Sequence, residues 1–94
     1  MEQYYNGAIK IRNRKVEMKW TGEYATHVLE NYNKKDGIHD LKHNEIQQLL
    51  KKSKYKKHRK RSYRAIGTYN DIEYTTVFIL TNKYAVIKTC YRYR

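Results

Sequence analysis

Apolar and polar residues alternate in three runs along the last third of the chain, residues 62–94, and two polar pairs, Asn70-Asp71 and Asn82-Lys83, separate the runs. Alternation in segments rich in Val, Ile, Thr, Tyr and Phe is typical of β-strands. Asn and Asp tolerate the positive φ angles that two-residue hairpin turns need. The pattern therefore predicts three antiparallel strands, with Tyr69 opposite Ile72 and Leu80 opposite Ala85.

Regular alternation sorts the residues of these strands onto two faces of a sheet. The first face is apolar enough to form a core and is predicted to hold Ala65, Gly67, Ile72, Tyr74, Phe78, Leu80, Ala85, Ile87 and Tyr91. The second face is half apolar and is predicted to hold Arg64, Ile66, Thr68, Glu73, Thr75, Val77, Ile79, Val86, Lys88, Cys90 and Arg92. We expect Arg64, Val77 and Lys88 in one row, with Glu73 beside Arg92. Either solvent or a ligand covers such a face.

Residues 3–20 predict a hairpin. AIKI and KVEMKW each alternate apolar and polar residues, and the polar RNRK between them can turn. Thr21 then suits the N-cap of a helix that runs to about Asn33. Its buried stripe is predicted to contain Tyr24, Ala25, Val28, Leu29 and Tyr32. Gly37 suits the left-handed position beyond the end of the helix.

A second helix is expected to begin near Asp40, with Glu45 outside. It is predicted to bury Leu41, Ile46, Leu49 and Leu50. The order is then ββααβββ in a single small basic domain, residues 1–94. We predict an α+β fold, with two helices packed on one face of a twisted antiparallel sheet. The face with Arg64 and Lys88 is left open.

Charge narrows the class of partner. The chain has 21 Lys and Arg against 9 Asp and Glu, which gives a net charge of +12 and a pI near 9.8. A positive electrostatic field attracts polyanions, so nucleic acid is the leading candidate partner, and an acidic membrane surface or an acidic protein comes next. The eleven tyrosines are typical of binding surfaces, and an AT-rich genome explains them as well.

Residues 51–64, KKSKYKKHRKRSYR, hold nine Lys and Arg in fourteen positions. One interpretation is a solvated, mobile connector. The interpretation that we favour is an arm that contacts phosphates, with Tyr55 and Tyr63 stacking on bases. The predicted nucleic-acid-binding residues are Lys51, Lys52, Lys54, Tyr55, Lys56, Lys57, His58, Arg59, Lys60, Arg61 and Tyr63.

Several classes are disfavoured. No segment has the roughly 18 apolar residues of a membrane span, and the N-terminus lacks the pattern of a secretory signal, so a cytoplasmic protein is expected. Cys90 is the single cysteine, so no internal disulfide can form. The four histidines do not form a compact ligand set, and no phosphate-binding loop or cofactor motif occurs. We expect neither metal nor cofactor.

Metal-independent cleavage of RNA remains compatible with these residues. It needs groups that take and give protons, and cations that stabilise the phosphorane. The candidate catalytic residues are His27, Arg64, Glu73, Lys88, Tyr91 and Arg92. Two of them have structural alternatives: His27 can be a core histidine, and Glu73 can form a plain ion pair with Arg92.

The chain resembles the α+β toxin ribonucleases of the RelE and BrnT type and a related family of small uncharacterised domains. The resemblance rests on ATHVLENYNKKDGIHDLKHNEIQQLL and YRAIGTYNDIEYTTVFILTNKYAVIKTCYR. These segments contain a His in the first helix, a Gly-Ile step between the helices, an Arg that leads into a Gly-containing strand, and a Thr-x-Tyr strand end. Asp36 and Asn31 depart from the pattern, because the relatives have a His and an Arg there.

The resemblance implies a toxin endoribonuclease that acts on free or ribosome-bound RNA and is held inactive by an acidic antitoxin. Two alternatives stay open. The chain can be a nucleic-acid-binding protein without catalysis on the same fold, or an interaction module for an acidic protein.

Overall fold

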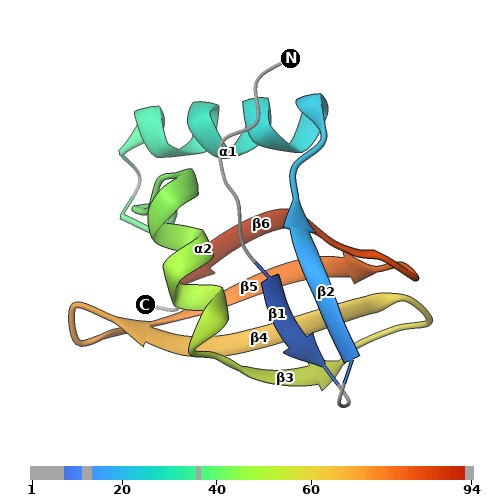
Figure 1. The fold of residues 1–94 in the computed structure, drawn as a ribbon. Coiled ribbons are helices and arrows are strands. Elements are labelled where there is room, and N and C mark those ends of the chain that lie inside the picture. Colours follow the sequence, from blue (N-terminus) through green and yellow to red (C-terminus); the bar gives the residue numbers. More distant parts are fainter. Residues whose placement is uncertain (1–7, 12–13, 36, 93–94) are drawn as a thin grey trace.

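The structure, a computed structural model, describes residues 8–11, 14–35 and 37–92. Two helices and six strands follow one another in the order ββααββββ (Figure 1). They are β1 (Ala8–Ile11), β2 (Arg14–Lys19), α1 (Gly22–Lys34), α2 (His43–Lys51), β3 (Lys54–Lys57), β4 (Ser62–Tyr69), β5 (Ile72–Leu80) and β6 (Tyr84–Arg92). The predicted α+β class is confirmed. The predicted order ββααβββ is wrong because it lacks β3.

All six strands form one curled sheet in the order β1-β2-β6-β5-β4-β3 (Figure 1). The first hairpin pairs β1 with β2 as predicted, although its turn lies outside the described residues. β2 then pairs with β6 in parallel, over Glu17 to Lys19 and Tyr84 to Val86. The sheet is therefore mixed, and the prediction of a purely antiparallel sheet is wrong. Parallel pairing requires a long connection, and the two helices with β3 to β5 supply it.

Next to their turns, the closing hairpins follow the predicted register. Tyr69 lies opposite Ile72 and Leu80 lies opposite Ala85. Asn70 and Asp71 have φ angles of 51° and 66°, which is the conformation of a type I′ turn. Asn tolerates this region better than most residues, so the local sequence fixes this turn.

A β-bulge interrupts the pairing of β5 with β6. Val77 lies opposite Thr89, but its neighbour Phe78 lies opposite Ile87, so Lys88 is an extra residue in β6. An extra residue reverses the faces of every residue that follows it. Cys90 therefore points into the core, where it is 5% exposed, and burial raises the pKa of its thiol to about 12.

The predicted faces are therefore wrong for the end of β6. Cys90 and Arg92 lie on the helix side of the sheet, and Tyr91 lies on the other side, opposite Thr75. The prediction failed because a sequence with regular alternation gives no sign of an added residue. Lys88 continues the alternation of apolar and polar residues, so the sequence does not mark it as the extra residue.

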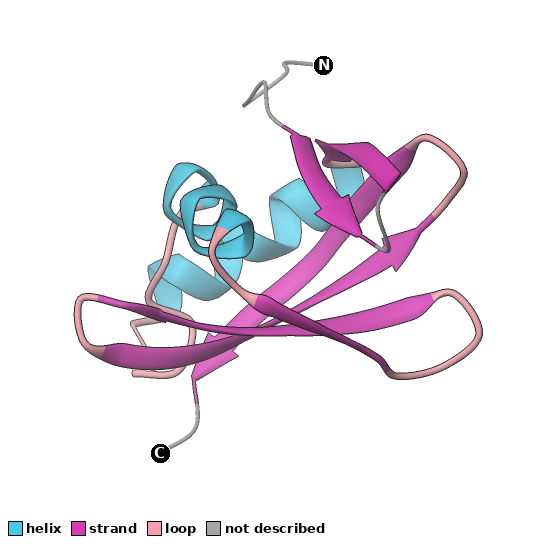
Figure 2. Ribbon diagram, turned by 60° about the horizontal axis from the view of Figure 1, so that its bottom comes forward, coloured by secondary structure: helices cyan, strands magenta, loops and turns pink. Residues whose placement is uncertain are grey.

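Both helices lie on one side of the sheet (Figure 2). Thr21 is the N-cap of α1 and accepts a hydrogen bond from Tyr24 N, as predicted. Ala25 and Val28 of the predicted stripe are buried, whereas Leu29 is 45% exposed, so its predicted burial is wrong. Lys35, with φ 52°, takes the left-handed position that ends the helix, two residues before Gly37.

α2 begins at His43, and the side chain of Glu45 caps its first turn by accepting from Lys42 N at 2.8 Å. The residues predicted to face inward are all buried: Leu41, Ile46, Leu49 and Leu50. The helix lies so close to β4 that a methyl group on Gly67 would be 3.0 Å from Leu49 Cδ1. Glycine permits this close approach. Neither helix of the described chain has the length and apolar character of a membrane span.

Arg92 fastens the loop between the helices to the end of β6. Its Nε donates to Gly37 O at 2.6 Å and lies 3.0 Å from Asp40 Oδ2, and its backbone N donates to Ile38 O. The two charged side chains are about a third exposed, at 31% and 30%. This clasp joins residues that are 55 positions apart.

We expect Arg92→Ala to lower the free energy of unfolding by about 1–2 kcal/mol, and Asp40→Ala by less, because only Arg92 also binds a backbone carbonyl. In urea denaturation, the free energy of unfolding of the double variant should fall by about 0.5–1 kcal/mol less than the sum of the two single losses. Arg59→Ala, in an exposed loop, serves as the control and should change stability by less than about 0.5 kcal/mol. Strict additivity would contradict the clasp.

Candidate nucleic-acid interface

Part of the basic segment forms the edge strand of the sheet. β3 pairs with β4 over its whole length, and only residues 58–61 form a loop. The interpretation as a mobile connector is wrong for β3, and contact of this segment with phosphates stays a prediction. Its single apolar residue is Tyr55, which packs against Phe78 with ring centroids 5.9 Å apart and donates from its hydroxyl to Leu50 O. Because these contacts and the backbone pairing join β3 to other elements, the lysine-rich sequence of β3 alone did not predict a strand.

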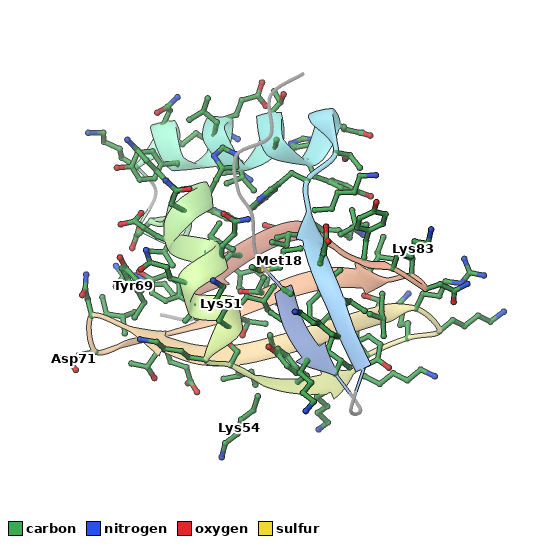
Figure 3. The ribbon with its side chains drawn as sticks, in the orientation of Figure 1. Met18, Lys51, Lys54, Tyr69, Asp71 and Lys83 are labelled. Carbon is green, nitrogen blue, oxygen red and sulfur yellow. The ribbon has the colours of Figure 1, made fainter. Side chains whose placement is uncertain are left out.

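Two rows of residues cross the sheet on the side away from the helices. One row is Lys54, Ile66, Thr75 and Tyr91, and the next is Lys56, Arg64, Val77 and Thr89. We call these eight residues the open face. Lys54 projects from it, away from both helices (Figure 3). The cations of the open face lie on β3 and β4, and its partly exposed tyrosine, Tyr91, lies on β6, whereas Thr75 on β5 is only 2% exposed.

Arg64 and His58 meet at the edge of the open face. Arg64 Nη2 lies 3.3 Å from His58 Nε2. A guanidinium group can only donate, so the contact requires a neutral imidazole that carries its proton on Nδ1. Desolvation, and then the positive charges of Arg64 and Arg59, lower the pKa of His58 from its ordinary 6.5. Another donor of this guanidinium, Nε, is buried and has no hydrogen-bond partner among the described residues.

Two loops meet at one end of the sheet and form what we call the basic corner, residues 57–61 and 81–83. Leu80 N donates to Arg61 O at 2.7 Å and holds the loops together. Between them lies a pocket of about 340 Å³. It is lined by Lys57, Lys60, Arg61, Tyr63, Leu80, Thr81 and Asn82.

The acidic residues are concentrated elsewhere. Asp71 lies at the turn between β4 and β5, at the opposite end of the sheet from Lys83 (Figure 3). Glu23 and Glu30 are on α1, while Asp40 and Glu45 are engaged by Arg92 and by the cap of α2. The sequence has no acidic residue between positions 46 and 70. The positive potential is therefore strongest at β3 and the basic corner.

The structure does not bring the six candidate catalytic residues together. His27 projects from α1, is 62% exposed, and lies 4.0 Å from Glu30, so it is not a core histidine either. Lys88 reaches towards α1, with Nζ 5.7 Å from the ring centroid of Tyr24. Arg92 is held in its clasp on the helix side.

Of that set, Arg64 and Tyr91 share the open face. Glu73 is exposed on the same side, opposite Thr68. The expected row of Arg64, Val77 and Lys88 is wrong, because Thr89 and not Lys88 lies opposite Val77. The expected pairing of Glu73 with Arg92 is also wrong, because the bulge places Arg92 on the opposite side. One added residue in β6 accounts for both errors.

The tyrosines of the basic segment are not placed for base stacking. Tyr63 is 5% exposed and stacks on Phe78, with ring centroids 5.5 Å apart. Tyr55 packs against the same ring from β3. The prediction that these two rings stack on bases is wrong, because alternation along β3 and β4 turns both inward. The other predicted nucleic-acid-binding residues are exposed: Lys51, Lys52, Lys54, Lys56, Lys57, His58, Arg59, Lys60 and Arg61.

Sequence reasoning missed Thr81 and Asn82, which complete the pocket. The register of the closing hairpins could have indicated them, because it places the loop after β5 at the same end of the sheet as the start of β4. Without β3, nothing indicated that residues 57–61 return to that end. Within the described residues no three His, Cys, Asp or Glu side chains are grouped so that they could hold a metal ion.

No protein-family model, no curated protein and no solved structure matches this chain. The resemblance to RelE-type and BrnT-type ribonucleases therefore stays a prediction.

We expect Arg64→Ala to raise the pKa of His58, because it removes a positive charge that opposes protonation of the ring. An NMR titration of the imidazole resonances measures this directly. Lys54→Ala is the control, since it removes the same charge from the far end of β3. An unchanged pKa in Arg64→Ala would contradict the contact.

Proposed function

We propose that this protein binds single-stranded RNA along the open face and the basic corner. The observation that carries the proposal is the pair of rows across the sheet, in which Lys54, Lys56 and Arg64 lie beside apolar and aromatic residues. Proteins that bind single strands combine a cationic track for the backbone with flat apolar or aromatic surfaces for the bases. RNA is preferred over DNA because the resemblance to toxin ribonucleases implies it.

Ile66 and Tyr91 supply the apolar part of this surface. Ile66 is 42% exposed and lies between Lys54 and Thr75 in its row. Tyr91 lies at the other end of the same row and is partly exposed. A strand that crosses from β3 to β6 would thus meet cations first and an aromatic ring last.

Lysines on an edge strand also have a purely structural role, since they prevent one sheet from pairing with another. β3 is an edge strand, so this role applies to Lys54 and Lys56. This structural role does not require further cations, yet Arg64 lies on the next strand inward and Lys60 and Arg61 lie in the loop. Binding of a polyanion accounts for both groups.

We expect Lys56→Gln to weaken binding to a fluorescent single-stranded RNA severalfold and to reduce the slope of log K against log salt by about one. Lys34→Gln removes the same charge from the end of α1 and should change the affinity by less than about twofold. Fluorescence anisotropy at several salt concentrations, repeated with DNA of the same sequence, measures both effects. Equal losses in the two variants would show that only net charge matters and would overturn the proposed surface.

Ribonuclease activity is the second candidate, and the contact between His58 and Arg64 favours it. A neutral imidazole can take the proton of a 2′-hydroxyl as its oxygen attacks phosphorus, and Arg64 can stabilise the phosphorane. The ammonium group of Lys56, opposite Arg64, can protonate the 5′-oxygen as its bond to phosphorus breaks. This site replaces the dispersed set of six residues as the place for such chemistry. An acidic antitoxin would then inhibit by covering the same cations.

We expect a catalytic protein to cleave labelled RNA in EDTA and to leave 2′,3′-cyclic phosphate ends. His58→Ala and Arg64→Ala should each reduce cleavage at least about a hundredfold, while His27→Ala should not. Cleavage that persists in His58→Ala would exclude this centre, and cleavage lost in His27→Ala would instead support the candidate catalytic set that includes His27. Salt-sensitive binding without cleavage leaves the protein as an RNA-binding module.

A further inference from the structure

The pocket in the basic corner has three chemically different walls. Lys57, Lys60 and Arg61 bring three positive charges to one side. Tyr63 and Leu80 form an apolar part, and Thr81 and Asn82 form a polar part. A ligand that matches all three must be anionic at one end and flat or apolar at the other.

The hydroxyl of Thr81 is already used within the loop. Its Oγ1 accepts from Tyr84 N at 2.9 Å and donates to Tyr84 O at 3.2 Å, which holds the start of β6 in place. Asn82 is exposed at the turn and has both a carbonyl and an amide to offer. Asn82 is therefore the polar side chain of this wall that is available to hydrogen-bond the edge of a ligand.

The size of the pocket selects among anions. A volume of about 340 Å³ lies within the usual range for small-molecule sites, and it exceeds what a phosphate ion alone would fill. Cations alone would suffice for inorganic phosphate, and the apolar wall would then contribute nothing. A nucleotide matches both features, because its phosphate is anionic and its base has an apolar face and a hydrogen-bonding edge.

We propose that this pocket binds one nucleotide unit of the RNA strand. Arg61, Lys57 and Lys60 hold the phosphate, Leu80 contacts the base or sugar, and Asn82 hydrogen-bonds the base edge. The assignment rests on the proposed RNA binding and adds a base-reading point at one end of the sheet. Because Lys57 and Tyr63 face the helix side, the strand would pass around the edge strand β3 from the pocket to Lys56 and Arg64 on the open face.

Two neighbouring arginines provide a matched test. Arg61 and Arg59 lie in the same loop and carry the same charge, but only Arg61 lines the pocket. Each can be replaced by Gln, and the probes are the four nucleoside 5′-monophosphates, the corresponding nucleosides and inorganic phosphate. Binding is followed by the amide chemical shifts of residues 57–61 and 80–83 during titration.

We expect a nucleoside monophosphate to bind at least about tenfold more tightly than its nucleoside or inorganic phosphate, because only the nucleotide meets all the walls. Arg61→Gln should weaken that binding about tenfold, and Arg59→Gln less than about twofold. Asn82→Ala should reduce the differences among the four bases, since the amide that reads the edge is lost. A circular-dichroism spectrum identical to that of the unmodified chain confirms that each variant folds.

Three results would overturn the assignment: inorganic phosphate that binds as tightly as the nucleotides, equal losses in Arg61→Gln and Arg59→Gln, or shifts confined to residues outside the pocket. If single-stranded RNA still binds the open face in any of these cases, the proposed function stands and only the nucleotide pocket fails. If RNA does not bind at all, both fail together.

Discussion

The β-bulge at Lys88 is the constraint on which the arrangement of this protein depends. It adds one residue to β6 between Ile87 and Thr89, and so turns Cys90 and Arg92 towards the helices. Arg92 can then bind Gly37 O and Asp40 and fix the loop between α1 and α2. The same reversal brings Tyr91 to the open face. One extra residue thus decides both how the helices are fastened and what the free side of the sheet presents.

The two sides of the curled sheet have different roles. The helices and the core lie on its inner side, where the aromatic rings of Tyr55 and Tyr63 pack against Phe78. Its outer side keeps the cations of β3 and β4. Most acidic side chains lie on the helices, in the loop between them or at the far turn, and Glu73 is exposed on the outer side opposite Thr68. A small basic domain can in this way bind a polyanion without placing charge in its core.

The positions of the cations matter more for function than their number. A dispersed set, with His27 on α1, Lys88 beside Tyr24 and Arg92 in a clasp, cannot act on one phosphate. By contrast, Arg64 Nη2 lies 3.3 Å from His58 Nε2, and the pocket beside Arg61 is lined by cationic, apolar and polar residues together. Binding, and any catalysis, is therefore expected at β3 and its loop, at the end of the sheet where no helix lies.

The amino-acid sequence by itself determined the elements whose signals are local. The alternation of β4 and β5, the turn at Asn70 and Asp71, the N-cap Thr21 and the inward residues of α2 all follow from neighbours in the chain. Only the tertiary structure decided that lysine-rich β3 is a strand, that β2 pairs with β6, and that Lys88 is a bulge. Those features depend on backbone pairing and packing between distant residues, which leave no periodic trace in the sequence. The candidate site combines both kinds of feature, so the sequence identified its cations but not their neighbours.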